Sequence, residues 1–171
     1  MMKKMTGFTL VELMVALVVA AILLAVGVPS FIATVRSSRT TSQANELVTA
    51  FNLARSEAVK RGVQVVVLRN GAEWEDGWQV FVDEDGDEAM GAGDTLVQVY
   101  SALSEGYTLR TGPNFTDWVA YLPTGLSVGN GSLPNGNFRL CTDEQDAATG
   151  RDIAINTVGR VVVREGATAC P

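Results

Sequence analysis

Apolar residues are concentrated at the start of the chain, where the segment Phe8–Val28 contains one charged residue, Glu12. A helix of this length would span roughly 31 Å, close to the roughly 30 Å hydrocarbon core of a bilayer. Lys3 and Lys4 precede the segment, and a short lysine-bearing flank stays on the cytoplasmic side of a membrane. The pattern therefore predicts one membrane-spanning helix, with the bulk of the chain on the far side.

Helical periodicity resumes beyond Pro29, a residue that we expect to bend or loosen the helix. Apolar residues recur at helical spacing over Ala44–Ala58, with charged residues between them. Gly62 follows two basic residues, a combination typical of a helix end. We predict one nearly continuous helix from about Phe8 to Arg61, whose second half buries an apolar stripe.

The rest of the chain is rich in β-branched residues interrupted by Gly, Pro, Asn and Asp, a pattern typical of short strands and turns. We expect eight strands, at 63–68, 78–82, 95–100, 107–110, 118–122, 137–141, 151–156 and 160–164. Because no long helix separates them, antiparallel sheets packed on the helix stripe are predicted. The fold class is α+β.

Composition removes several functional classes. The 171 residues include no histidine and two cysteines, and the formal net charge is −6. Histidine-dependent nucleophile arrangements, histidine-based metal sites and a Cys₄ metal site are therefore excluded. No glycine-rich phosphate-binding motif is present, and no carboxylate pair stands out as an acid–base couple. We predict neither an enzyme nor a cofactor.

Three interpretations of the N-terminal segment compete. A cleaved secretory signal would have a shorter apolar run ending in a small-residue site, whereas this run continues past such triplets. A plain membrane anchor fits the length but not Glu12, because a carboxylate in hydrocarbon costs about 2.5–3.5 kcal/mol. The third interpretation is a membrane helix in which Glu12 has a function, and it explains both the length of the apolar run and the acid within it.

The segment Lys3–Glu12 resembles the processing site of type IV prepilins and pseudopilins, in which a short basic leader ends in Gly before Phe and an apolar helix. The resemblance implies that prepilin peptidase cuts between Gly7 and Phe8 and methylates the new Phe8 amine. It also implies that Glu12 pairs with the Phe8 amine of a neighbouring subunit in a filament. Such a pair makes a buried carboxylate tolerable and can set the register of subunit addition.

Later segments are similar to the GspH/FimT group of minor pseudopilins. They are Leu53–Gly62 with its Ala-Arg-Ser-Glu-Ala core, Gly77–Asp83, Tyr121–Gly125 and Gly159–Val161. The resemblance implies a structural subunit that primes or caps a type IV pilus or a type II secretion pseudopilus. The implied partners are other minor and major pilins or pseudopilins, prepilin peptidase and the inner membrane.

This resemblance also predicts a division of the chain. Residues 1–7 form the leader, 8–29 the transmembrane and filament-core helix, and 30–171 the periplasmic globular domain with the amphipathic half of the helix. The precursor is then a single-pass inner-membrane protein with a cytoplasmic N-terminus, which later enters the pilus or pseudopilus.

Cys141 and Cys170 are expected to form a disulfide in an oxidising periplasm. The crosslink would contribute on the order of 3–4 kcal/mol and hold the C-terminus to a strand. The alternative is a pair of buried free thiols.

An acidic stretch lies between Gly71 and Asp94 and contains no Lys or Arg. Four of its acids occupy places one, three, five and twelve of a possible calcium loop: Asp83, Asp85, Asp87 and Asp94. Glu88 stands at place six, where calcium loops need Gly, and Asp94 is shorter than the usual Glu. We therefore favour a solvated acidic hairpin tip that meets a partner's basic surface over a metal site.

DNA uptake is the alternative function. Some FimT-like proteins are thought to bind DNA through a Gly-Arg-x-Arg motif, and here Arg160 has the first position while Arg164 comes two places late. The two arginines would share one face of a strand. Phosphate binding would have to overcome a net charge that becomes more negative than −6 once the leader lysines are removed. DNA is therefore disfavoured as a partner, and the arginines are more simply a solvated strand face.

Overall fold

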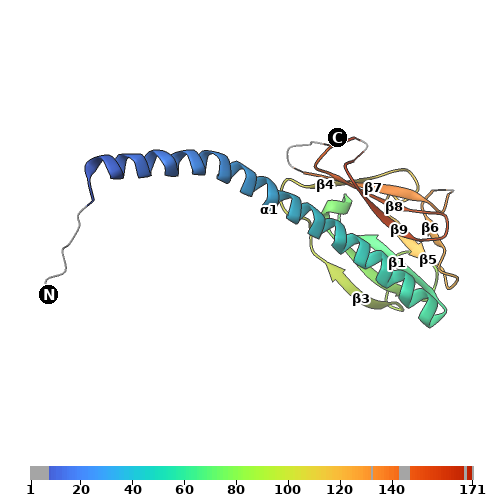
Figure 1. Ribbon diagram of the computed structural model, residues 1–171. Helices are drawn as coiled ribbons and strands as arrows, with labels where there is room; N and C mark the ends of the chain where they lie inside the picture. The colour runs from blue at the N-terminus through green and yellow to red at the C-terminus, as the bar shows by residue number, and fades with distance from the viewer. Residues whose placement is uncertain (1–7, 132, 143–146, 168, 171) are drawn as a thin grey trace. The chain divides into compact units, whose positions relative to one another are not determined.

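The computed structural model describes residues 8–131, 133–142, 147–167 and 169–170. Helix α1, Leu10–Arg61, runs through Pro29 without a break. It ends at Arg61, just before Gly62, as the sequence predicts. The chain divides into two compact units, one up to Ser38 and one from Arg39 onward, and α1 contributes to both (Figure 1).

The first unit is the apolar part of α1. Every side chain over residues 8–34 is exposed, including Leu10 at 73% and Leu23 at 67%. Within the part of the chain that the structure describes, α1 is the one helix long and apolar enough to cross a membrane. The described residues therefore leave this apolar surface uncovered.

The second unit carries two antiparallel sheets. The first has the order β3-β2-β1-β5-β6, and the second has the order β4-β7-β8-β9. The strands of the first sheet are β1 (Gln64–Arg69), β2 (Trp78–Asp83), β3 (Thr95–Tyr100), β5 (Trp118–Tyr121) and β6 (Ser127–Gly129). Those of the second are β4 (Thr108–Thr111), β7 (Gly136–Cys141), β8 (Arg151–Ile155) and β9 (Val161–Glu165). The predicted fold class and all eight predicted strands are confirmed, while β6 was not predicted.

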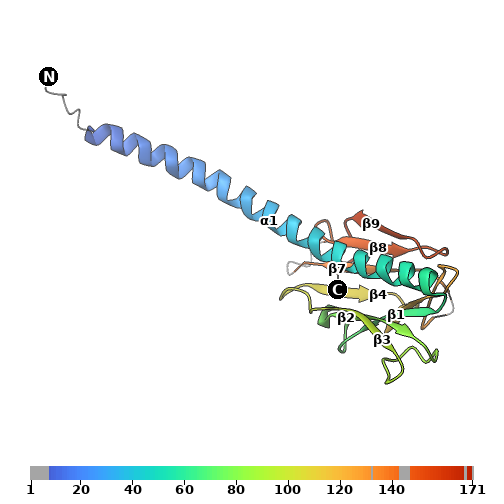
Figure 2. The same cartoon turned by 90° about the horizontal axis from the view of Figure 1, so that it is seen from below.

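The part of α1 from Arg39 onward lies over both sheets, with β8 and β9 to one side and β1 and β3 to the other (Figure 2). Its predicted apolar stripe is buried, apart from the half-buried Val48. Phe51 is fully buried, with its ring centroid 5.1 Å from that of Phe138 on β7 and 6.5 Å from that of Trp74. Trp74 belongs to a 3-10 helix, η1 (Trp74–Asp76), that the sequence analysis missed. One aromatic cluster therefore joins the helix, η1 and the second sheet.

The predicted disulfide between Cys141 and Cys170 is present, with 5.7 Å between the two Cα atoms. Cys141 is the last residue of β7, and its side chain is buried. The crosslink therefore anchors the C-terminal segment to a central strand of the second sheet.

Candidate functional sites

The N-terminal site consists of Phe8, Thr9 and Glu12 at the start of α1; Gly7, the other half of the predicted cleavage site, lies outside the described residues. The Glu12 backbone N–H donates to Thr9 Oγ1 at 3.2 Å. The Thr9 backbone N–H donates to Glu12 Oε2 at 3.2 Å, and the Thr9 hydroxyl donates to the same oxygen at 3.1 Å. This reciprocal arrangement is a capping box, in which a side chain at each position satisfies a backbone donor at the other.

The capping box gives Glu12 a local role that the sequence analysis missed. The Thr-x-x-Glu spacing of Thr9 and Glu12 was the available signal. The box keeps the carboxylate at the N-terminal end of the helix, where unpaired N–H groups favour negative charge. Glu12 therefore lies beside the residue whose amine cleavage would expose, Phe8, which is itself 78% exposed.

Three of the segments used for family resemblance converge at one place in the second unit. Arg55 on α1 donates from Nε to the Gly125 carbonyl and from Nη2 to the Val158 carbonyl, each at 3.0 Å. Gly159 has a φ of +73°, and a Cβ there would overlap the Gly125 carbonyl oxygen and the Tyr121 ring. Burial raises the pKa of Tyr121, so the ring stays neutral in this contact. These segments therefore form a structural junction between the helix and two loops.

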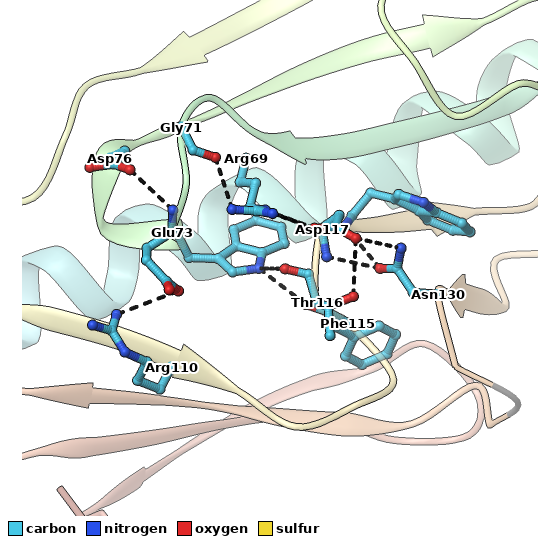
Figure 3. Close-up of polar contacts among 11 residues, drawn as sticks. Arg69, Gly71, Glu73, Asp76, Arg110, Phe115, Thr116, Asp117 and Asn130 are labelled. Carbon is cyan, nitrogen blue, oxygen red and sulfur yellow. Dashed lines mark hydrogen bonds and ion pairs between the residues drawn. The ribbon is translucent and has the colours of Figure 1, made fainter. Parts of the chain in front are cut away.

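A second network holds η1 between the sheets (Figure 3). The Trp74 indole N–H donates to the carbonyls of Phe115 and Thr116, at 3.1 and 3.0 Å. Arg69 on β1 forms an ion pair with Asp117, which also accepts a hydrogen bond from Asn130 Nδ2 at 3.0 Å. These bonds fix the segment before β5 against β1 and η1.

Arg110 on β4 links the second sheet to η1. Its guanidinium forms a close ion pair with Glu75. It also lies 3.7 Å from a Glu73 carboxylate oxygen, the contact drawn in Figure 3. The hydrogen bond to Glu75 raises the pKa of Arg110 further above its already high range. Two acids of the sequence's acidic stretch therefore serve as structural partners of a cation.

The acidic loop brings three of the four predicted metal ligands together. One carboxylate oxygen from each of Asp83, Asp85 and Asp87 lies within 4.8 Å of the others. Asp94 is not part of that group. Its two oxygens accept backbone N–H groups of Glu84 and Gly91, at 3.0 and 2.7 Å.

The remaining loop acids also act within the loop. Asp83 is buried and accepts hydrogen bonds from the N–H groups of Gly86 and Glu88 and from Gln64 Nε2. Glu88 adopts a φ of 59°, the left-handed conformation for which a calcium loop uses Gly. Partial desolvation and the nearby charge of Asp87 raise the pKa of Asp85. The loop is therefore an acidic hairpin tip in which carboxylates accept hydrogen bonds from the loop's own backbone N–H groups.

The two arginines of the DNA alternative lie at different kinds of position. Arg160 precedes β9, in a turn where its N–H donates to Asn156 Oδ1 at 2.9 Å. Arg164 lies opposite Asp152 in the β8–β9 register, with its Nη1 3.6 Å from Asp152 Oδ2. The Arg164 charge is therefore partly balanced, which weakens its attraction for phosphate.

Comparison with known families agrees with this architecture. The chain matches the family described as Type II transport protein GspH over residues 43–159, and the prokaryotic N-terminal methylation motif over residues 2–28. A helix packed on antiparallel sheets with such a motif defines a pilin-class structural subunit. The chain belongs to the GspH family. A search of curated protein sequences gives no significant match.

Two kinds of solved structure share the fold. The type IV minor pilin FimU of Pseudomonas aeruginosa aligns with a TM-score of 0.62 at 17% identity, covering 78% of this chain and 96% of that one. The minor pseudopilin EpsH from the type 2 secretion system of Vibrio cholerae aligns with a TM-score of 0.54 at 13% identity, covering 74% and 97%. The predicted class of minor pilin or pseudopilin is confirmed, and nothing in these comparisons specifically favours DNA uptake.

Proposed function

We propose that this protein is a single-pass inner-membrane precursor that is trimmed between Gly7 and Phe8 and then enters a filament as a minor subunit. Residues 8–29 form the membrane and filament-core helix, and residues 30–171 form the periplasmic part. The subunit primes or caps a type IV pilus or a type II secretion pseudopilus, together with other pilin-class subunits. Its role is structural rather than catalytic.

The observation that carries this proposal is the exposed apolar half of α1 with its one capped acid. The apolar side chains of residues 8–34 are not buried by any part of the chain that the structure describes, so their burial must come from lipid or from other subunits. The methylation motif covers the same region.

The capping box supports an assembly role for Glu12. Its carboxylate has polar partners while the subunit is alone, which lowers the cost of keeping an acid in the membrane. Cleavage would create an ammonium group at Phe8, and in a filament the Glu12 of one subunit can pair with the ammonium of the next. A side-by-side array of helices buries this pair, and an unpaired acid would be excluded from the same place.

The direct test is Glu12→Ala in cells that make prepilin peptidase and the companion subunits. We expect normal trimming, measured by mass spectrometry, but at least tenfold less of the variant in the sheared filament fraction. The matched control is Glu105→Ala, which removes an exposed acid of the globular unit and should enter filaments normally. Incorporation of Glu12→Ala at the wild-type level would contradict the assembly role.

The cleavage step is tested separately. Gly7→Leu should leave the precursor at full length in the presence of the peptidase, and it should stay in the membrane fraction. If filament-borne wild-type protein retains its first seven residues, the processing part of the proposal is wrong.

A further inference from the structure

A groove of about 310 Å³ runs along α1 beside the segment that follows β3. The helix side is formed by Arg39, Ser42, Gln43 and Glu46, and the opposite side by residues 101–104. All of these residues belong to the second unit. The positions of the helix residues repeat at helical spacing, so they form one face.

One residue of the groove lining, Gln43, carries a buried acceptor without a donor. Gln43 is 8% exposed, and its Oε1 atom has no hydrogen-bond partner within the described chain. A buried carbonyl oxygen that is left unpaired carries a desolvation cost. An N–H donor in the groove would remove that cost.

The two ends of the groove carry opposite charges. Arg39 and Glu46 are both exposed, and neither forms an ion pair within the described residues. They lie seven residues apart, which is about 10 Å along the helix axis, too far for a direct ion pair between them. One end of the groove therefore attracts an anion and the other a cation.

The walls of the groove are held in place. The Leu103 N–H donates to the Glu75 carbonyl at 2.9 Å, which ties the loop to η1. Tyr100, just before the loop, stacks on the buried Trp78 with ring centroids 5.6 Å apart. The groove is therefore preformed, which reduces the entropy lost on binding.

One wall of the groove is the segment that directly follows the edge strand of the first sheet. β3 is the outer strand of that sheet, and residues 101–104 follow it directly (Figure 1). β3 carries no charged side chain, and Leu96 and Val99 are 48% and 50% exposed. Edge strands of monomers are usually blunted by charges, because an open edge can pair with another strand.

We infer that this groove binds an extended segment of a neighbouring pilin-class subunit, one with an acidic and a basic side chain on the same face. Two side chains four residues apart on an extended segment lie about 13 Å apart. The long side chains of Arg39 and Glu46 can reach both of them. A rotation of the Gln43 side chain would bring its Oε1 within reach of a backbone N–H of the segment, and residues of the segment beyond the groove can pair as a strand beside β3. The identity of the occupant rests on the proposed function, but the chemistry of the groove does not.

The groove is tested with short peptides and the full-length protein in detergent micelles. The probes are acetyl-Glu-Thr-Val-Thr-Lys-amide and its reversed sequence, with perturbation of the Gln43 side-chain NMR signal as the readout. We expect saturable binding of one of them, which fixes the direction of the segment. Failure of both peptides to perturb Gln43 would overturn the inference.

Charge variants provide the specificity control. Glu46→Lys should weaken the bound probe about tenfold, and a probe with Glu in place of its Lys should restore the affinity. Asn45→Lys, which adds a cation on the same helix outside the groove lining, should leave binding unchanged. Equal losses for Glu46→Lys and Asn45→Lys would refute a specific site.

Filament entry separates this inference from the proposed function. Glu46→Lys should be trimmed normally but enter filaments less than Asn45→Lys. If Glu46→Lys enters normally while Glu12→Ala is excluded, the neighbouring subunit is not the occupant and the inference fails alone. If Glu12→Ala enters normally, the assembly role of Glu12 fails while peptide binding remains a separate result.

Discussion

The two halves of α1 show how one helix can depend on two different environments. The half before Ser38 buries none of its side chains, whereas the half from Arg39 onward buries eight residues, from Thr40 to Ala58. Both halves belong to one continuous helix, so the difference lies in what covers the apolar face. The second half is stabilised by its own chain, and the first half needs lipid or other subunits.

This contrast can be measured because all three tryptophans, Trp74, Trp78 and Trp118, lie in the second unit. Tryptophan fluorescence of the full-length protein in detergent therefore reports unfolding of that unit. Variants of the second half of α1 should shift this signal, and variants of the first half should not.

The largest effect is expected for Phe51→Ala. Removing a fully buried ring from the cluster with Trp74 and Phe138 should lower the free energy of unfolding by about 3–5 kcal/mol. The measurement is denaturant unfolding followed by tryptophan fluorescence. Val15→Ala, in the exposed half, is the control and should leave the midpoint unchanged. A similar shift for both variants would break the distinction between the halves.

The next effect is that of the disulfide. Replacing both Cys141 and Cys170 by Ser should lower the free energy of unfolding by about 3–4 kcal/mol, because the crosslink closes a loop with a sequence separation of 29. Reduction of the wild-type protein should lower the unfolding midpoint as much as the double Ser substitution does. A reduced protein with an unchanged midpoint would show that the C-terminal segment is held by packing alone.

A smaller effect is expected at the junction between α1 and the loops. Arg55→Ala should cost about 1–3 kcal/mol, because it leaves the Gly125 and Val158 carbonyls without their charged donor. Arg61→Ala is the matched control, since Arg61 pairs only with Glu57 on its own helix among the contacts that the structure describes. Denaturation midpoints that fall equally for the two variants would argue against the junction.

The smallest effect is expected for Thr9→Ala, which should act on the first turn of α1 and leave the tryptophan signal unchanged. Loss of the capping box should cost the first turn of α1 about 1 kcal/mol, seen as faster amide exchange near Glu12 in micelles. The unfolding midpoint of the second unit should not move. Unchanged exchange near Glu12 would mean that the cap does not stabilise this end of the helix.

The fold was predictable where a residue pattern is long or regular. The apolar run, the helical stripe and eight β-rich segments led to α1 and to eight strands at nearly their observed bounds. β6 was missed because Ser127–Gly129 is three residues long, too short for alternation to be recognised. η1 was missed for the same reason, although a large aromatic residue between acids marked its position.

The candidate sites were less predictable, because side-chain partners come from distant parts of the chain. The sequence marked Arg55 only by resemblance, and its two carbonyl partners lie 70 and 103 residues away. Likewise, the loop spacing suggested Asp94 as a metal ligand, whereas the folded loop directs its oxygens to backbone N–H groups. Sequence spacing identifies residue types that could act together, but folding decides which atoms meet.

The hydrogen bonds between Thr9 and Glu12 have a consequence for the timing of filament growth. In the assembly role proposed for Glu12, its carboxylate would give up the two Thr9 donors when the ammonium group of a neighbouring helix arrives, so the bonds that are lost reduce the gain from the new pair. Addition and departure of a subunit are then both accessible. The Thr9 donors would then take up the Glu12 carboxylate again whenever a subunit leaves its neighbour.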